Sequence, residues 1–446
     1  MTDHVGVDDR RNADDGSTAD GSRFRPRQDR RDPFADGVDR RRLLRSSAAA
    51  GGAAALAGCL GNGDESETAP TVYVFNTGDR TVTIVDAEAN EAVETAHVDT
   101  TASFPANQYG TGADSGYDVC WLNVSGGVVA LDQRDLEEIA RVETGFGPNY
   151  PNLSPDEDHL LVAAGGTTGM DPEPDPDDPE DHPIVRVDAD PESDEFGEIT
   201  GAIETGYAGP CDVTMDADGE HAYVPEIAHE TLRVVRTDPL ETVAEVDVGE
   251  PAGDGDVLPF MATAAWDGDL LAVENGEGEL GPDGDREGSE SVWDVSDPEE
   301  PEEITRITRD DGLPAMPITS EIDPDGEVAY LFTPDADSVT VIDLDELAVA
   351  GELEVGGSAI SAAWGPNREQ LYVPVQTADH VAVIDHAERE VVETIETGDS
   401  PTGAVAGMIR PEPSASQRIA AALAGLGVEI GDSEPTACPE GNCYCG

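Results

Sequence analysis

A repeated strand pattern constrains the fold of this chain more than any other feature of its sequence. The three clearest copies occupy residues 72–86, 329–343 and 371–385. Each copy is a run of β-branched and aromatic residues, a polar turn, and a second alternating run that ends in Asp, which predicts two antiparallel strands joined by a hairpin. A third strand follows each copy, and a short strand precedes it. Tandem units of four strands are typical of the blades of a β-propeller.

The number of repeats predicts seven blades. Four weaker copies lie between the clear ones, at residues 120–132, 160–188, 222–235 and 270–295. The first blade, which begins at Thr71, lacks an innermost strand, and residues 401–408 supply a spare one after the last blade. Pairing these two ends closes the ring and leaves no open edge strand. We therefore predict an all-β, seven-bladed β-propeller at residues 71–410 that is closed by a C-terminal strand.

The repeats resemble the YVTN, or YncE-like, family of seven-bladed propellers. The Tyr-Val pairs at Tyr73 and Tyr372 and the Val-Ile-Asp runs that end at Asp343 and Asp385 carry this resemblance. The resemblance implies an extracytoplasmic propeller scaffold, often a surface binding protein. It implies no single reaction, because one fold hosts many functions.

The N-terminal residues have the parts of an export signal. Arg41 and Arg42 precede a short apolar stretch at residues 48–58, which is too short and too weakly hydrophobic to span a membrane. Consecutive arginines before such a stretch resemble the twin-arginine signal. We expect residues 1–58 to be a disordered arm followed by a signal peptide.

The end of this signal resembles a lipobox. The sequence Leu-Ala-Gly-Cys ends at Cys59, and a cysteine in this context becomes the lipidated first residue of the mature chain. Residues 59–70 would then form a flexible tether, and the protein would be anchored to the outer face of the cell membrane. A cytoplasmic protein with a basic arm is the alternative, but it leaves Cys59 unexplained.

The charge of the chain points to a solvent of concentrated salt. The sequence has 97 Asp+Glu against 24 Lys+Arg, and its formal net charge is -73. Self-repulsion at this charge density destabilises a compact chain, but molar salt shortens the Debye length to about 3 Å. The acids are spread along the whole chain, which favours a haloarchaeal type of protein over an acidic tail. The same charge excludes binding to nucleic acid.

The channel at the centre of the ring is one candidate binding site. Several polar residues follow the prolines that open the inner strands, and we expect them on the channel wall: Asn107, Asn149, Tyr150, Cys211, Asp212, Thr319 and Glu321. They could bind a small ligand or cofactor. The alternative is a water-filled channel whose polar wall is satisfied by solvent.

Two weaker patterns lie in the turns. His182, His229 and His380 follow second strands on one face of the ring, but their blades lie too far apart for a shared metal site to be expected. Residues 283, 285 and 287 alternate as in a calcium loop without the rest of that motif. His159 and His221 occupy equivalent turns of two blades and are expected to be features of the repeat.

The C-terminal residues 411–446 contain a helix and a cysteine-rich tail. Ile419, Leu423 and Leu426 form one helical stripe, and we expect this stripe to dock the helix on the propeller. Cys438, Cys443 and Cys445 follow in the last nine residues. A small disulfide loop and a soft-metal site for copper or zinc both remain open for them.

The sequence contains no recognisable catalytic motif. It has no Cys-x-x-Cys-His, which excludes c-type haem, no nucleophile elbow and no phosphate-binding loop. We therefore predict a non-catalytic binding module that meets a protein or cell-envelope partner through its loop-rich face. The alternative is a redox or metal-handling protein with its cofactor in the channel or at the C-terminal cysteines.

Overall fold

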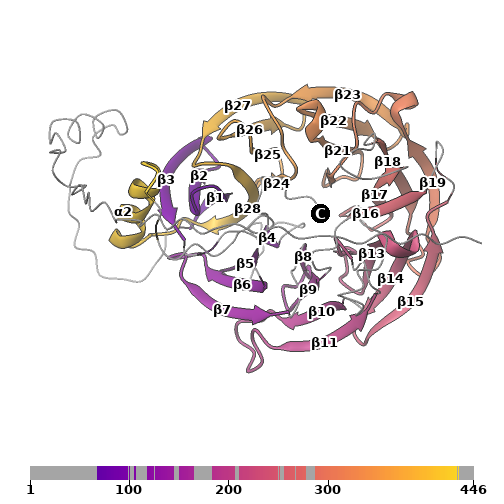
Figure 1. Ribbon diagram of the computed structural model, residues 1–446, viewed down its shortest axis with the longest axis horizontal. Helices are drawn as coiled ribbons and strands as arrows, with labels where there is room; N and C mark the ends of the chain where they lie inside the picture. Colours follow the sequence, from indigo (N-terminus) through magenta and orange to yellow (C-terminus); the bar gives the residue numbers. More distant parts are fainter. Residues whose placement is uncertain are drawn as a thin grey trace, which may run out of the picture. The chain divides into compact units, whose positions relative to one another are not determined.

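The computed structural model divides the chain into two units, Met1–Asp64 and Glu65–Gly446. It describes residues 68–98, 100, 105–106, 118–124, 126–144, 150–164, 183–205, 210–249, 251, 256–266, 268–277, 287–428 and 430. All of these lie in the second unit, where they form seven four-stranded antiparallel sheets arranged as a ring (Figure 1). The prediction of a seven-bladed β-propeller is confirmed.

The blades follow the order of the chain. From the inner to the outer strand, blades one to three are β28(Pro401–Ile409), β1(Thr68–Asn76), β2(Thr81–Asp86) and β3(Glu91–His97); β4(Pro105–Ala106), β5(Val119–Val124), β6(Gly127–Asp132) and β7(Glu138–Glu143); and β8(Pro151–Leu153), β9(His159–Ala163), β10(Pro183–Asp188) and β11(Ile199–Glu204). Blades four and five are β12(Thr214–Met215), β13(His221–Glu226), β14(Thr231–Thr237) and β15(Leu240–Asp247); and β16(Val257–Ala264), β17(Leu270–Glu277), β18(Glu287–Asp294) and β19(Glu302–Ile307). Blades six and seven are β20(Thr319–Ile322), β21(Val328–Thr333), β22(Ser338–Asp343) and β23(Ala348–Glu354); and β24(Ala363–Trp364), β25(Gln370–Val375), β26(His380–Asp385) and β27(Glu390–Glu396). Three single turns of 3-10 helix, η1(Ile227–His229), η2(Arg309–Asp311) and η3(Pro334–Ala336), lie between strands.

The core lies between adjacent blades. The second strands are buried on both faces because each blade packs against a neighbour on either side, so these strands are almost continuously apolar. A fully buried tyrosine recurs in these strands, as Tyr73, Tyr223, Tyr330 and Tyr372. The outer strands face solvent and carry exposed glutamates. This gradient from apolar to acidic explains why the inner repeats are easier to recognise in the sequence.

The ring is closed in blade one by the two ends of the propeller, as predicted. β28 pairs with β1 in antiparallel register, with Val72 opposite Ala406 and Val74 opposite Ala404. The Tyr73 hydroxyl donates a hydrogen bond to the carbonyl oxygen of Ile409. Backbone pairing over this length leaves neither end strand as an open edge.

The one α-helix among the described residues, α2(Ala415–Ala424), follows the closing strand and lies against β3 (Figure 1). A capping box starts it: the Ser414 hydroxyl accepts a hydrogen bond from the backbone N–H of Gln417, whose side chain in turn accepts from the N–H of Ser414. The Gln417 amide donates to the carbonyl oxygen of Asp135 at 2.9 Å, and Arg418 forms an ion pair with Glu94. These polar contacts fix the helix on blade one.

The apolar stripe of this helix faces away from the propeller, which corrects our expectation. Ile419, Leu423 and Leu426 are 62%, 39% and 68% exposed, whereas Ala421 on the opposite side is buried. The physical reason is the surface on which the helix lies. The outer strand β3 carries polar side chains such as Glu94, and the small side chain of Ala421 lets the helix backbone approach it. No helix among the described residues is long and apolar enough to cross a membrane.

Candidate functional site

Five of the residues expected on the channel wall lie at the inner strands of blades three, four and six. Tyr150 precedes β8, Cys211 and Asp212 precede β12, and Thr319 and Glu321 lie in β20. All except Tyr150 are almost fully buried, and Tyr150 packs against an apolar group that includes Cys211. The negative charges of Glu321 and Asp212 both raise the pKa of Tyr150, after burial itself, so the three side chains lie within electrostatic reach of one another.

Glu274 lies at the centre of this group, and sequence reasoning missed it. The Asp212 charge raises the pKa of Glu274, and the Glu274 charge raises the pKa values of Glu321 and Glu290. We call Tyr150, Asp212, Glu274, Glu290 and Glu321 the inner-wall acid cluster. Its members come from blades three to six, so the ring assembles it from segments that are far apart in the sequence.

Strand register places two members of the cluster, Glu274 and Glu290, opposite each other as its central pair. Glu274 in β17 lies directly opposite Glu290 in β18, and the two are 0% and 1% exposed. Because side chains two residues apart in a strand share a face, Glu274 and Glu290 point to the same side as Ala272 and Val292. Those two residues pack against Leu331 of blade six. The two carboxyl groups therefore face the boundary between blades five and six.

Burial shifts the pKa values of all four carboxyl groups upward. Desolvation raises the pKa of Asp212 to about 7, although its carboxylate accepts backbone N–H bonds from Val213 at 2.7 Å and Ala262 at 2.9 Å. Desolvation likewise raises the pKa of Glu274 to about 8, and those of Glu290 and Glu321 well above the ordinary value. At neutral pH, Glu274 is therefore mostly protonated, and burial favours the protonated forms of Glu290 and Glu321 as well.

The central pair has no hydrogen bonds to satisfy it. None of the four carboxyl oxygens of Glu274 and Glu290 has a hydrogen-bond partner in the described part of the chain. The Ser320 hydroxyl lies near Glu274 and lowers its pKa somewhat, but it also has no partner in hydrogen-bond geometry. Buried polar groups are almost always paired, so an unpaired pair of carboxyl groups needs an explanation.

The surroundings of the cluster are apolar. Tyr150 packs against a group that includes Phe260, Met261, Met316 and Ile318. Cys211, in the same group, is disulfide-bonded, so its sulfur is not a free thiolate for a soft metal. The donors at this site are therefore oxygen atoms. Oxygen ligands suit hard cations, whereas copper(I) and zinc prefer sulfur and nitrogen.

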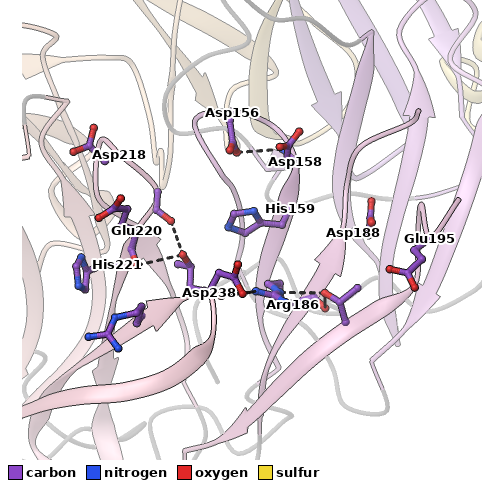
Figure 2. A pocket seen from close by; sticks show the side chains of 14 residues that line it. Asp156, Asp158, His159, Arg186, Asp188, Glu195, Asp218, Glu220, His221 and Asp238 are labelled. Atoms are coloured by element: carbon purple, nitrogen blue, oxygen red, sulfur yellow. Dashed lines mark hydrogen bonds and ion pairs between the residues drawn. The ribbon is translucent and has the colours of Figure 1, made fainter. Parts of the chain in front are cut away.

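A second candidate is an open cleft of about 730 Å³ between blades three and four (Figure 2). The turns after β8, β10, β12 and β14 line it, so it opens on the face opposite the long loops. Its lining is strongly acidic, with two arginines and two histidines: Asp156, Asp158, His159, Arg186, Asp188, Glu195, Asp218, Glu220, His221, Arg236 and Asp238.

The arginines and His221 of this cleft are held by near neighbours. Arg186 donates to the carbonyl oxygen of Thr237 at 2.6 Å, and the Nδ1 atom of His221 lies 3.2 Å from a carboxylate oxygen of Asp216. Burial lowers the pKa of His159, which is therefore neutral at pH 7. The backbone N–H of His159 donates a hydrogen bond to the Ser154 hydroxyl at 3.1 Å, and that of His221 donates to the Asp216 carboxylate at 3.2 Å. The cleft is thus built mainly from turns that every blade repeats.

Of the histidines predicted in the turns after second strands, the structure describes His229 and His380. Both ring nitrogens of His380 lie within hydrogen-bond distance of backbone carbonyl oxygens, at 3.1 Å from Ala378 and 2.9 Å from Val355. His229 ends the 3-10 turn η1. Glu287 is exposed at the start of β18. Across the described ranges, no three His, Cys, Asp or Glu side chains are arranged to hold a metal ion.

Several predicted positions lie outside the described residues, and the structure does not test them. They are Arg41, Arg42, Cys59, Asn107, Asn149, His182, Asp283, Asp285, Cys438, Cys443 and Cys445.

Comparisons with known proteins support the β-propeller fold alone. No protein-family description and no curated protein matches the sequence. Among solved structures, a functionally unknown protein from Desulfotomaculum acetoxidans is 13% identical with a TM-score of 0.56, and the match covers 77% of this chain and 100% of that one. Kuenenia stuttgartiensis hydrazine synthase is 17% identical, with a TM-score of 0.55 over 75% of this chain and 99% of that one. The periplasmic gluconolactonase of Pseudomonas aeruginosa is 15% identical, with a TM-score of 0.55 over 76% and 99%. At these identities the chain shares with them its β-propeller fold.

Proposed function

We propose that this chain is an exported, lipid-anchored β-propeller that acts as a non-catalytic binding module, and that it binds a hard cation such as calcium between Glu274 and Glu290 of the inner-wall acid cluster, where further oxygen ligands must move in to complete the site. The export and anchoring signals at Arg41, Arg42 and Cys59 support the location outside the membrane. The likeness of the repeats to YVTN propellers supports a binding scaffold. The loop-rich face remains our proposal for contact with a protein or cell-envelope partner.

One observation carries the choice of site: the carboxyl groups of Glu274 and Glu290 are buried, directly opposed and without hydrogen-bond partners among the described residues. Leaving a buried polar group unpaired costs about 1–3 kcal/mol, and more when it is charged. Natural proteins keep such groups at binding and catalytic sites. By contrast, both arginines of the open cleft between blades three and four form ion pairs with carboxylates.

The chemistry of the cluster favours a small hard cation. Its donors are carboxyl groups, the Ser320 hydroxyl and the Tyr150 hydroxyl, which are oxygen ligands of the kind that calcium uses. The residues on the face of Glu274 and Glu290, such as Ala272, Val292 and Leu331, are buried and apolar, which disfavours a bulky polar ligand. Binding must displace the proton that Glu274 holds at neutral pH, and this displacement gives the site a measurable signature.

The experiment is calorimetric titration of calcium into the protein in molar KCl at pH 7, in two buffers with different ionisation enthalpies. We expect one binding event whose enthalpy depends on the buffer, because a proton leaves Glu274 when the cation binds. The surface carboxylates are already ionised at this pH and release none. Glu274→Gln/Glu290→Gln should abolish the proton-linked event.

The matched control is Glu352→Gln/Glu354→Gln, which removes two exposed carboxylates from the outer strand β23. This variant should bind calcium with the same proton release as the wild type. Buffer-independent heats, or identical heats in both double variants, would rule out the site. Stoichiometric copper or zinc in the pure protein, or hydrolysis of a sugar lactone such as the gluconolactonase neighbour's name implies, would overturn the proposed function instead.

A further inference from the structure

The C-terminal helix α2 presents an apolar face that nothing in the described part of the chain covers. Ile419 and Leu423 lie one turn apart, and Leu426 continues their line just beyond the end of the helix. All three are well exposed, at 62%, 39% and 68%. Three large apolar side chains in a row on one surface mark an interaction site more often than single exposed ones do.

The helix also lacks the acidity of the rest of the chain. Residues 413–428 contain no Asp or Glu, although the whole sequence has 97 acids in 446 residues. The one charged side chain of this stretch, Arg418, is held by Glu94 of β3. The outward surface of α2 is therefore apolar and uncharged, which distinguishes it from the acidic outer strands around it.

The tether places this surface near the membrane, an argument that rests on the lipid anchor of the proposed function. Nine residue steps separate Cys59 from Thr68, where β1 begins, and Thr68 pairs with Ile409 at the end of β28. A chain of nine residues spans at most about 30 Å. The helix starts at Ala415, shortly after Ile409. A lipid on Cys59 would therefore hold Thr68, which lies beside the segment that leads into α2, within about 30 Å of the bilayer.

We propose that the apolar face of α2, formed by Ile419, Leu423 and Leu426, inserts into the surface of the membrane and acts as a second contact beside the lipid. An apolar side-chain contact beside a lipid adds to the buried apolar area on which membrane binding depends. The acidic surface of the protein does not oppose this contact in molar salt, where charges are screened beyond about 3 Å. The lipid and the apolar face of α2 together would also fix the orientation of the ring above the membrane.

The test is co-sedimentation of the full-length Cys59→Ser protein, which cannot be lipidated, with vesicles of anionic and of zwitterionic lipid. We expect weak binding to both that becomes stronger as salt rises, because salt screens the acidic surface and favours apolar burial. Ile419→Ser/Leu423→Ser/Leu426→Ser should reduce this binding by about tenfold or more.

The matched control is Ile139→Ser/Ile199→Ser/Ile304→Ser, which removes three isoleucines of 44%, 44% and 42% exposure from outer strands. It should bind vesicles like its parent. Equal loss in both triple variants, or binding that falls with salt, would overturn the inference. A concentration-dependent dimer that only the α2 variant abolishes would assign the face to a second copy of this chain. Mass spectrometry of Cys59 tests the lipid anchor separately.

Discussion

At the scale of single residues, the inner-wall acid cluster makes stability depend on protons. Glu274 holds its proton up to a pKa of about 8, against an ordinary value of 4.5. Between these values the folded protein binds a proton that the unfolded chain has lost, so the free energy of unfolding falls as pH rises. Most buried acids in ion pairs behave in the opposite way, because pairing lowers their pKa.

The pH dependence can be isolated with Glu274→Gln/Glu290→Gln, since an amide resembles a protonated carboxyl group. We expect the wild type and this variant to have similar melting temperatures at pH 5. As pH rises from about 5 to about 8, the wild type should lose up to about 1.4 kcal/mol per pH unit for each proton, relative to the variant. Thermal melts in high salt at several pH values measure the difference. Parallel curves for the two proteins would contradict it.

At the scale of elements, the closing strand holds the ring together. Val405 of β28 lies opposite Tyr73 of β1, is 1% exposed, and packs between blades one and two with residues such as Leu122. Side chains of this strand join the last segment of the propeller to its first two blades. The pairing of β28 with β1, which we call the seam, should therefore be as sensitive to core mutations as the strand pairs within any other blade.

We expect Val405→Ala to destabilise the protein by roughly 2 kcal/mol, from lost apolar burial and the cavity that remains. Val93→Ala on the outer strand β3 is the control, because Val93 is 46% exposed, and it should change stability by less than about 0.5 kcal/mol. The shift of the denaturant midpoint in high salt measures both. Similar shifts for the two variants would mean that the seam contributes little to stability.

How far the sequence could predict each element depends on how local its cause is. The hairpin at residues 329–343 is recognisable because alternation and turn residues are local features. The helical period of Ile419 and Leu423 is local as well, but it does not say whether the apolar face turns inward. That depends on the polar surface of β3, which reaches the helix only through ring closure.

The residues of the candidate site also differ in how far the sequence could predict them. Asp212 and Glu321 were predicted because a proline opens the inner strand near each of them. Glu274 and Glu290 were missed because two glutamates among 97 acids are unremarkable in the sequence. Their burial depends on the packing of blade five against blade six. The one available signal was the apolar run at residues 270–273 that leads directly into Glu274.

At the scale of the whole molecule, the acids are placed on the outside of the ring. Each outer strand bears exposed glutamates, for example Glu91 in β3, Glu302 in β19 and Glu390 in β27. Exposed carboxylates therefore lie side by side on the described rim, where neighbouring charges repel one another. Salt screens this repulsion, because the Debye length falls from about 10 Å at 0.1 M to about 3 Å at 1 M.

We expect the melting temperature to fall steadily as NaCl is lowered from molar concentrations to about 0.1 M, because the repulsion acts over a longer distance. Lowering the pH to about 4 at low salt should restore part of the stability by protonating rim carboxylates. Circular dichroism melts across this grid of salt and pH measure both effects. A melting temperature that does not change with salt would exclude a role for the rim charge.

The closing strand β28 is synthesised long after β1, and this delay affects folding during synthesis. Tyr73 and Ile409, which meet at the seam, are separated by 336 residues. At about 5–20 residues per second, roughly 20 to 70 s pass between the synthesis of these two residues. Throughout this interval β1 has no inner partner and exposes a row of unpaired backbone groups, to which a strand of another nascent chain can pair. The same seam that leaves the finished ring without an edge makes blade one the last to be completed, although its second strand is the first to emerge from the ribosome.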